Sequence, residues 1–245
     1  MSEYHRGKTM KRFVSVAAGL LLFIGIMVGI IIVLSNIRRF PPSTVITSTE
    51  CDPPCWYGIR PGETTPQEAI GILVNLDLVS DMGGWPNEPM FKRKAPELSQ
   101  ITWTFIRTEA VGDIEGCAYL QDDRVIAISL RTLGSLTISE AFDRLGEPEL
   151  VLTRVHKSDY REWVRVILIY PTDGYQVEVD INLSVATQDN QVEITADTPV
   201  YRVQYFDPGQ YEYLIGWRIL IDGLGIAALD NARHWQGFGE ITVEK

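Results

Sequence analysis

Hydrophobic and polar positions form three different patterns along this chain, and the first is a long apolar run near the N-terminus. Residues 13–34 contain no charged side chain. As an α-helix this run reaches about 33 Å, enough to cross a bilayer core of about 30 Å. A helix packed on the core of a soluble protein usually shows a polar stripe, and this run has none. The pattern therefore predicts a transmembrane helix.

Two later segments, 65–78 and 137–145, show apolar residues at helical spacing. Each begins with a threonine that is followed three positions later by a glutamate, which is the capping-box pattern of a helix start. Pro66 suits the first helical position of the first segment, and Gly146 suits the C-terminal end of the second. Both segments are expected to be amphipathic helices that bury one face on a sheet.

Strand-like segments follow each predicted helix. The clearest is 175–183, where apolar residues alternate strictly with polar ones. Such alternation is typical of an antiparallel strand with one buried face and one solvent-exposed face. Asp122-Asp123 is typical of a hairpin turn between two such strands. The other predicted strands are 101–105, 116–121, 124–131, 164–170, 192–194, 199–206 and 240–243.

Together these elements predict an α+β fold, in which an N-terminal transmembrane helix precedes a tandem repeat of helix plus antiparallel sheet. The last forty residues are expected to cap the second sheet. The expected organisation is a cytoplasmic tail 1–12, a transmembrane helix 13–34, a linker 35–50, a first α+β module 51–133 and a second α+β module with its cap 134–245.

Basic residues flank the apolar run unequally, with four before it and two close after it. The positive-inside rule then predicts a single-pass protein of the cytoplasmic membrane, with residues 35–245 outside. A cleaved signal peptide is the alternative, but it would have a shorter apolar region and a small-residue cleavage site. Gly25 and Gly29 form a G-x-x-x-G pattern that would allow weak self-association, although glycine is also simply common in membrane helices.

The charge of the chain excludes one class of partner. Of its 22 Lys and Arg residues six precede residue 40, and of its 32 Asp and Glu residues one does, so residues 40–245 carry a net charge of −15. Nucleic-acid binding needs clustered basic residues, so no nucleic-acid partner is expected. A protein or peptide partner is expected instead, and the acidic surface favours a basic one.

Three cysteines, Cys51, Cys55 and Cys117, would all lie on the oxidising side. The spacing of Cys51 and Cys55 around two prolines predicts a small disulfide loop. Cys117 lies in an apolar, strand-like run and is expected to be a buried structural thiol. The three histidines of the chain are distant from these thiols in sequence, so no metal site is expected.

Two short motifs, 58–65 (GIRPGETT) and 145–148 (LGEP), resemble parts of a helix-on-sheet module. This module is known from the SmpA/OmlA outer-membrane assembly lipoprotein family and from the tandem β-lactamase inhibitory protein fold. The opening of the exterior part, C-x-x-P-C-W-x-G-I-x-P-G, also looks like that of uncharacterised membrane-anchored bacterial exterior proteins. The first copy lacks the G-x-P stop and the second lacks the Pro-Gly entry turn. The resemblance implies a binding or scaffolding module without catalytic residues.

The candidate chemistry is sparse. Gly223-Leu-Gly225-Ile-Ala-Ala228 fits a dinucleotide fingerprint only formally, because too few residues follow to complete the βαβ unit. No catalytic residue, cofactor or metal ligand is therefore assigned. The leading hypothesis is a non-enzymatic, membrane-anchored extracytoplasmic binding or scaffolding protein, and the alternatives are a hydrolase that uses unrecognised carboxylates and a structural subunit of a membrane complex.

Aromatic residues near predicted strand ends and in the C-terminal cap are the candidate binding residues. Tyr and Trp suit recognition surfaces because they bury much area at a low cost in rotamer entropy. The candidates are Trp85, Tyr201, Tyr205, Tyr211, Tyr213 and Trp235.

Overall fold

The computed structural model describes residues 51–77, 79–83, 89–91, 95–105, 115–158, 162–183, 191–216, 219–220 and 226–243, together with Ile24, Gly25 and Met27. Contacts within the chain define two units. One of them comprises Phe40–Arg107 and Val111–Lys245 and holds every described residue from Cys51 onward. The description below concerns this unit.

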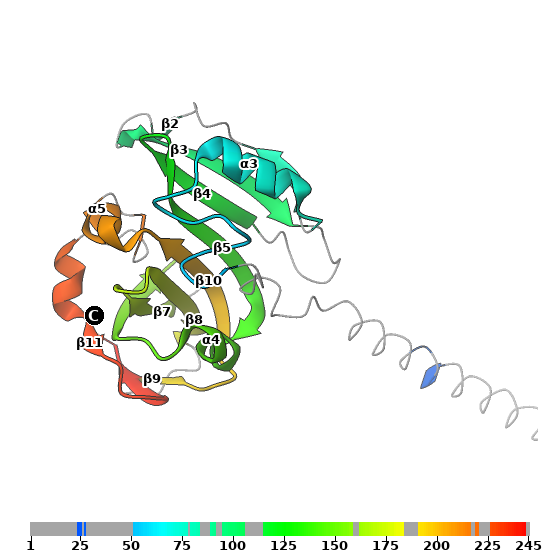
Figure 1. Ribbon diagram of the computed structural model, residues 1–245. Coiled ribbons are helices and arrows are strands. Elements are labelled where there is room, and N and C mark those ends of the chain that lie inside the picture. The colour runs from blue at the N-terminus through cyan, green and yellow to red at the C-terminus, as the bar shows by residue number, and fades with distance from the viewer. Residues whose placement is uncertain are drawn as a thin grey trace, which may run out of the picture. The chain divides into compact units, whose positions relative to one another are not determined.

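An antiparallel sheet dominates the described part of the chain (Figure 1). Its ten strands follow the order β1-β3-β4-β5-β10-β8-β7-β6-β11, with β2 paired to β3, and β12 pairs with β9 in a separate two-stranded sheet. The strands are β1 (Val79–Gly83), β2 (Pro89–Phe91), β3 (Ala95–Phe105), β4 (Glu115–Gln121), β5 (Arg124–Thr137), β6 (Leu150–Lys157), β7 (Glu162–Tyr170), β8 (Tyr175–Asn182), β9 (Gln191–Ile194), β10 (Pro199–Phe206), β11 (Arg233–His234) and β12 (Gly239–Thr242).

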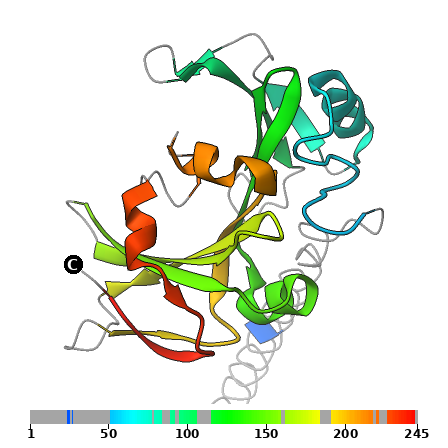
Figure 2. The ribbon, with the colours of Figure 1, turned by 60° about the vertical axis from the view of Figure 1, so that its left-hand side comes forward.

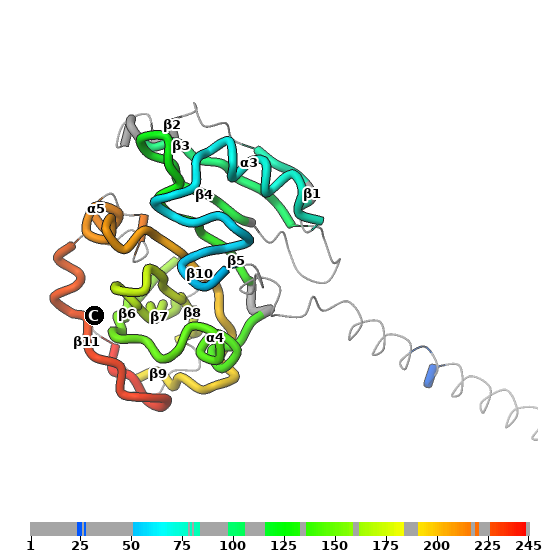
Figure 3. The backbone as a smooth tube through the Cα atoms, in the orientation of Figure 1, coloured from blue at the N-terminus to red at the C-terminus, as the bar shows by residue number. Residues whose placement is uncertain are grey.

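The pairing of β5 with β10 joins the strands before and after the second helix into one sheet (Figure 3). Pro199 lies opposite Thr137 at one end of this seam, and Phe206 lies opposite Ala127 at the other. The boundary expected between residues 133 and 134 falls inside β5.

The expected fold class, α+β with a transmembrane helix and a tandem repeat of helix plus antiparallel sheet, is therefore wrong. The described chain is mostly antiparallel sheet with few helices. The physical reason is that an unpaired strand edge exposes backbone hydrogen-bonding groups. Because β5 and β10 pair with each other, their backbone hydrogen-bonding groups are satisfied. The later strands therefore extend the first sheet instead of forming a separate sheet.

Helices α3 (Pro66–Asn75) and α4 (Ile138–Leu145) begin at the predicted capping boxes. The carboxylate of Glu68 accepts a hydrogen bond from the backbone N–H of Thr65 at 2.8 Å, and Glu140 does the same for Thr137. The bond from Thr65 holds the pKa of Glu68 below its ordinary value. Both helices pack on the same face of the sheet, where the buried helical residues are Ala69, Leu73, Ile138, Ala141 and Leu145.

The predicted transmembrane helix, 13–34, lies outside the described residues apart from Ile24, Gly25 and Met27, and so does Gly29. Within the part of the chain that the structure describes, no helix combines the length and the apolar character that a membrane crossing requires.

The disulfide between Cys51 and Cys55 is present as the sequence predicted, with Cα atoms 5.7 Å apart. It stabilises a tight loop in which Trp56 and Ile59 form a β-bridge, and the N–H of Gly58 lies 3.3 Å from the Cys51 sulfur. Trp56 is fully buried, and its ring stacks on that of Trp103 with centroids 5.4 Å apart. The loop therefore directs an aromatic side chain into the core.

Replacing both Cys51 and Cys55 with serine is expected to lower the free energy of unfolding by about 2 kcal/mol. The loop spans a sequence separation of only 4, and a short loop removes less entropy from the unfolded chain than a long one. Denaturant unfolding of the full chain measures the loss. Cys117→Ser is the control because this thiol lies outside the disulfide, and an equal loss in the control would contradict the assignment.

Candidate binding site

The two faces of the sheet differ in chemistry. The face under α3 and α4 is covered by the larger apolar cluster. The opposite face carries a second apolar cluster, to which Leu214 and Ile215 of α5 (Tyr211–Gly216) belong. Figure 2 shows α5 and the short helix η2 (Pro208–Gln210) before it in orange. The short helix η4 (Ile226–Asn231) packs against the same cluster through Ala228 and Leu229. Beside this cluster the second face carries polar side chains of β3, β4, β5 and β10, and the candidate site lies there.

A hollow of about 470 Å³ opens on this polar part of the sheet. Thr102 on β3 lies opposite Cys117 on β4, which lies opposite Ser129 on β5. This register brings the three side chains to one face, because alternate residues of a strand point the same way. The hollow is lined by Asp81, Gly83, Gln100, Thr102, Trp103, Thr104, Gly116, Cys117, Tyr119, Ser129, Arg131 and Arg202.

Two arginines stand side by side at the hollow. Arg131 on β5 lies directly opposite Arg202 on β10. Arg202 in turn lies opposite Glu178 on β8. A row of three charged residues therefore crosses the seam of the sheet, and its first two members line the hollow.

Buried ion pairs hold the charged residues of this row in place. The carboxylate of Glu178 is fully buried and lies 3.4 Å from a guanidinium nitrogen of Arg202 and 3.6 Å from one of Arg165. The side chain of Gln176 donates a hydrogen bond to Glu178 at 3.0 Å. Arg165 also donates a hydrogen bond to each carboxylate oxygen of Asp180, at 2.7 and 2.9 Å. Hydrogen-bonded and paired in this way, the buried charges hold fixed positions.

Aromatic rings complete the electrostatic surroundings. A bulge between Val200 and Arg202 interrupts the register of β10, and the guanidinium carbons of Arg165 and Arg202 lie 4.7 and 5.3 Å from the ring centre of Tyr201. Burial is the largest single influence on Arg202 and opposes its charge, but the attractions to Glu178 and Tyr201 together outweigh it and raise the pKa of Arg202 above its ordinary value. Burial, helped by the nearby Cys117, also raises the pKa of Tyr119. At neutral pH Tyr119 is therefore a protonated hydroxyl at the hollow.

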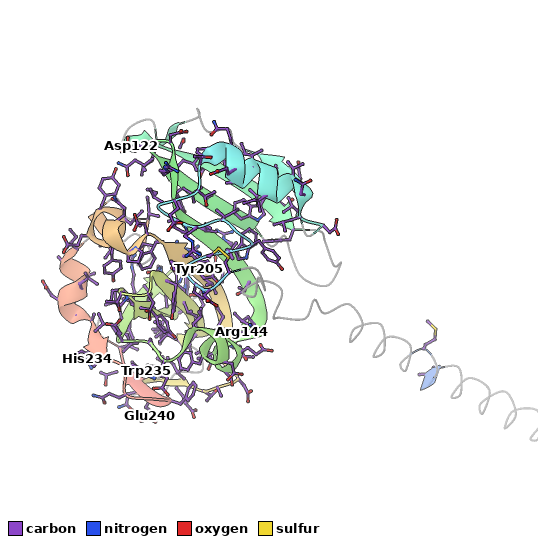
Figure 4. All side chains as sticks on the ribbon, in the orientation of Figure 1. Asp122, Arg144, Tyr205, His234, Trp235 and Glu240 are labelled. Carbon is purple, nitrogen blue, oxygen red and sulfur yellow. A yellow bond between two sulfur atoms is a disulfide. The ribbon has the colours of Figure 1, made fainter. Side chains whose placement is uncertain are left out.

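Of the sequence-predicted binding residues that the structure describes, one lies beside the hollow and the others lie elsewhere. Tyr201 belongs to the arginine network, whereas Tyr205 is buried in the core (Figure 4). Tyr211 stacks on Phe206 with centroids 5.3 Å apart. Tyr213 packs on the apolar cluster under α5, and Trp235 packs on the larger apolar cluster under α3 and α4. Trp85 lies outside the described residues.

Sequence reasoning missed the charged centre of the site. The alternation along β8 placed Gln176 and Glu178 on a wet face, but both side chains are fully buried. Gln204 on β10 accepts a hydrogen bond from the Gln176 side chain at 2.6 Å and donates one to the carbonyl of Ile219 at 3.4 Å, which ties the segment after β10 to these polar side chains. The sequence signal that could have indicated this charged centre was the concentration of charged residues inside predicted strands. Cys117, expected to be buried, is half-buried at the hollow.

Two other depressions are less suited to a specific ligand. One of about 820 Å³ is a broad, open surface feature beside α3, where Arg60 and Glu63 form a largely exposed ion pair. One of about 280 Å³ lies between β6 and the C-terminal segment. Among the described residues that line these two depressions, no charged side chain is fully buried as Glu178 is. Among the residues that the structure describes, no group of His, Cys, Asp and Glu could hold a metal ion.

Comparisons of the chain with protein-family models, with curated proteins and with solved structures find no match.

Proposed function

We propose that this protein is an extracytoplasmic binding module and that the polar hollow on the sheet contacts its ligand. The observation that supports this most strongly is the convergence of polar side chains from five neighbouring strands, β1, β3, β4, β5 and β10, on one hollow. Ligand sites typically combine a concave surface with a few fixed polar groups. The ion pairs beneath Arg202 provide that fixation.

The location outside the cytoplasm is supported by the disulfide, because disulfides persist mainly in oxidising compartments. The resemblance to the helix-on-sheet binding module is a second argument and stays a prediction.

A binding role is favoured over a carboxylate hydrolase by the composition of the hollow. Acid–base catalysis by carboxyl groups typically uses two whose environments separate their pKa values. Among the described residues that line the hollow, Asp81 is the one carboxylate. Glu178 and Asp180 are engaged by arginines instead.

A ligand-capture experiment tests the proposal. The purified full chain is incubated with a low-molecular-weight extract of the cell envelope, and molecules that elute with it are identified by mass spectrometry. In a Thr102→Tyr variant the larger side chain fills the hollow without changing its charge. We expect at least a tenfold loss of the captured molecule.

The matched control is Thr242→Tyr, at an exposed position on β12. It should capture as much ligand as the unaltered chain, and the unfolding midpoints should show that both variants fold. Equal capture by Thr102→Tyr, no captured molecule, or turnover of the captured molecule would each overturn the proposal.

A further inference from the structure

We infer that the ligand of the hollow is a neutral saccharide, which hydroxyl and amide side chains of β3 and β5 bind. This inference rests on the proposed function, because it names the ligand class of the same site. It is carried by a row of uncharged residues that crosses the middle of the hollow, and by the hydrogen-bonding groups that this row and its neighbours present.

The first step concerns the floor of the hollow. Gly83 on β1, Thr102 on β3, Cys117 on β4 and Ser129 on β5 lie opposite one another in turn, and all four line the hollow. None of these residues is acidic or basic. The floor therefore favours a ligand that forms hydrogen bonds over one that forms an ion pair.

The second step concerns two hydroxyl groups of this row. Ser129 is only 8% exposed, yet its hydroxyl has no hydrogen-bond partner among the residues that the structure describes. The hydroxyl of Thr102 also has none there, and β1 places no side chain over it, since a Cβ atom at Gly83 would lie 3.3 Å from its oxygen. Buried polar groups are normally hydrogen-bonded, so these hydroxyls fit a ligand that supplies the bonds.

The third step concerns the side of the hollow formed by Gln100 and Tyr119, which lie opposite each other. The amide oxygen of Gln100 lies 3.6 Å from the Cys117 sulfur, and the two N–H donors of the same amide have no partner in the described chain. Tyr119 adds a flat apolar ring with a protonated hydroxyl at its edge. This combination suits a sugar ring, which has apolar C–H faces and a polar rim.

The charged residues of the hollow lie in the neighbouring row. Asp81 is two positions from Gly83, and Arg202 lies opposite Arg131, two positions from Ser129. Arg202 is already paired with the buried carboxylate of Glu178. These residues border the uncharged floor, where they can exchange hydrogen bonds with the hydroxyl groups of a neutral ligand.

A saccharide fits this lining better than the other ligand classes. Each sugar hydroxyl both donates and accepts, as do the serine and threonine hydroxyls and the glutamine amide on the protein side. An apolar ligand would leave these groups without hydrogen bonds, which is costly. A peptide bound through its main chain pairs with the edge of a sheet, whereas β3, β4 and β5 lie inside this one.

The experiment measures binding of the full chain to immobilised neutral oligosaccharides of glucose, galactose, mannose and N-acetylglucosamine. We expect saturable binding to at least one of them, with competition by the same sugar in solution. The permethylated form of that oligosaccharide is the ligand control. It keeps the acceptor oxygens but has no hydroxyl donors, so it should compete at least tenfold more weakly.

Two variants test the residues. Thr102→Val and Ser129→Ala each remove one hydroxyl with little change in shape, and each should raise the dissociation constant at least fivefold. Thr242→Val, at an exposed position on β12, is the matched control and should bind as the unaltered chain does. The unfolding midpoints show that the variants fold.

The absence of saturable binding to every oligosaccharide would overturn the inference. So would equal binding by the unaltered chain, Thr102→Val and Ser129→Ala, or equal competition by the permethylated sugar. If Thr102→Tyr still abolishes capture of a ligand under those outcomes, the proposed function stands and only the saccharide class is wrong. If capture fails as well, both are wrong.

Discussion

A Glu178→Gln variant is expected to lose about 3–5 kcal/mol of the free energy of unfolding, the usual cost of removing one partner from a buried ion pair. Glu178 is fully buried, and its carboxylate lies within 4 Å of guanidinium nitrogens of both Arg165 and Arg202. Glutamine has nearly the same shape but no charge, so two arginines would keep their charge in a poorly hydrated place. Urea unfolding of the full chain measures the change as a lower midpoint.

Two control variants separate the buried charge from a general sensitivity of this region. Asp180→Asn removes the other carboxylate that Arg165 contacts, but the Asp180 side chain is 22% exposed and its loss should cost about 1 kcal/mol. The double variant Glu178→Gln, Arg202→Gln should recover part of the stability, because it removes one of the charges left without compensation. A loss below about 1 kcal/mol in Glu178→Gln would show that the network is not stabilising.

A Trp56→Ala variant is expected to lose about 3–5 kcal/mol, the range for truncating a buried large aromatic side chain. Trp56 is fully buried, stacks on Trp103 and meets Phe105 edge to face with centroids 6.0 Å apart. The truncation leaves a cavity between the disulfide loop and β3. Denaturant unfolding again gives the change in the free energy of unfolding.

The matched control for Trp56→Ala is Trp163→Ala on β7, where the tryptophan is only half-buried and stacks on His156. Its loss should be clearly smaller. Because the disulfide shapes the loop that carries Trp56, replacing Cys51 and Cys55 should cost less in the Trp56→Ala background than in the unaltered chain. Strictly additive losses would mean that the disulfide and Trp56 act independently.

Local features of the fold were predictable from the sequence because they depend on neighbouring residues. The capping boxes at Thr65 and Thr137 need only a threonine and a glutamate three positions apart, and both were confirmed. The disulfide depends on two cysteines close in sequence and was confirmed as well. The turn at Asp122-Asp123 joins β4 and β5, with both residues at positive φ as a tight hairpin requires.

Features that depend on distant pairing were not predictable. The seam between β5 and β10 makes a single sheet, and neither strand carries a local signal for the other. The same pairing places Arg131 beside Arg202. The charged centre of the site could therefore not be predicted either, because it also depends on strands that are distant in sequence. Core and surface aromatic residues could not be told apart from the sequence for another reason: the apolar ring that suits a tyrosine to recognition also suits it to the core, where Tyr205 lies.

The seam between β5 and β10 also sets the order in which the chain can fold. The hairpins β3–β4–β5 and β6–β7–β8 join strands that are neighbours in sequence, so they can form early. The seam must wait until Pro199–Phe206 has been synthesised, and it closes a long loop, which slows folding. Until then β5 presents an open edge to other chains during synthesis. The strand that completes the arginine pair is thus also the strand that ends the period in which the nascent chain is prone to aggregate.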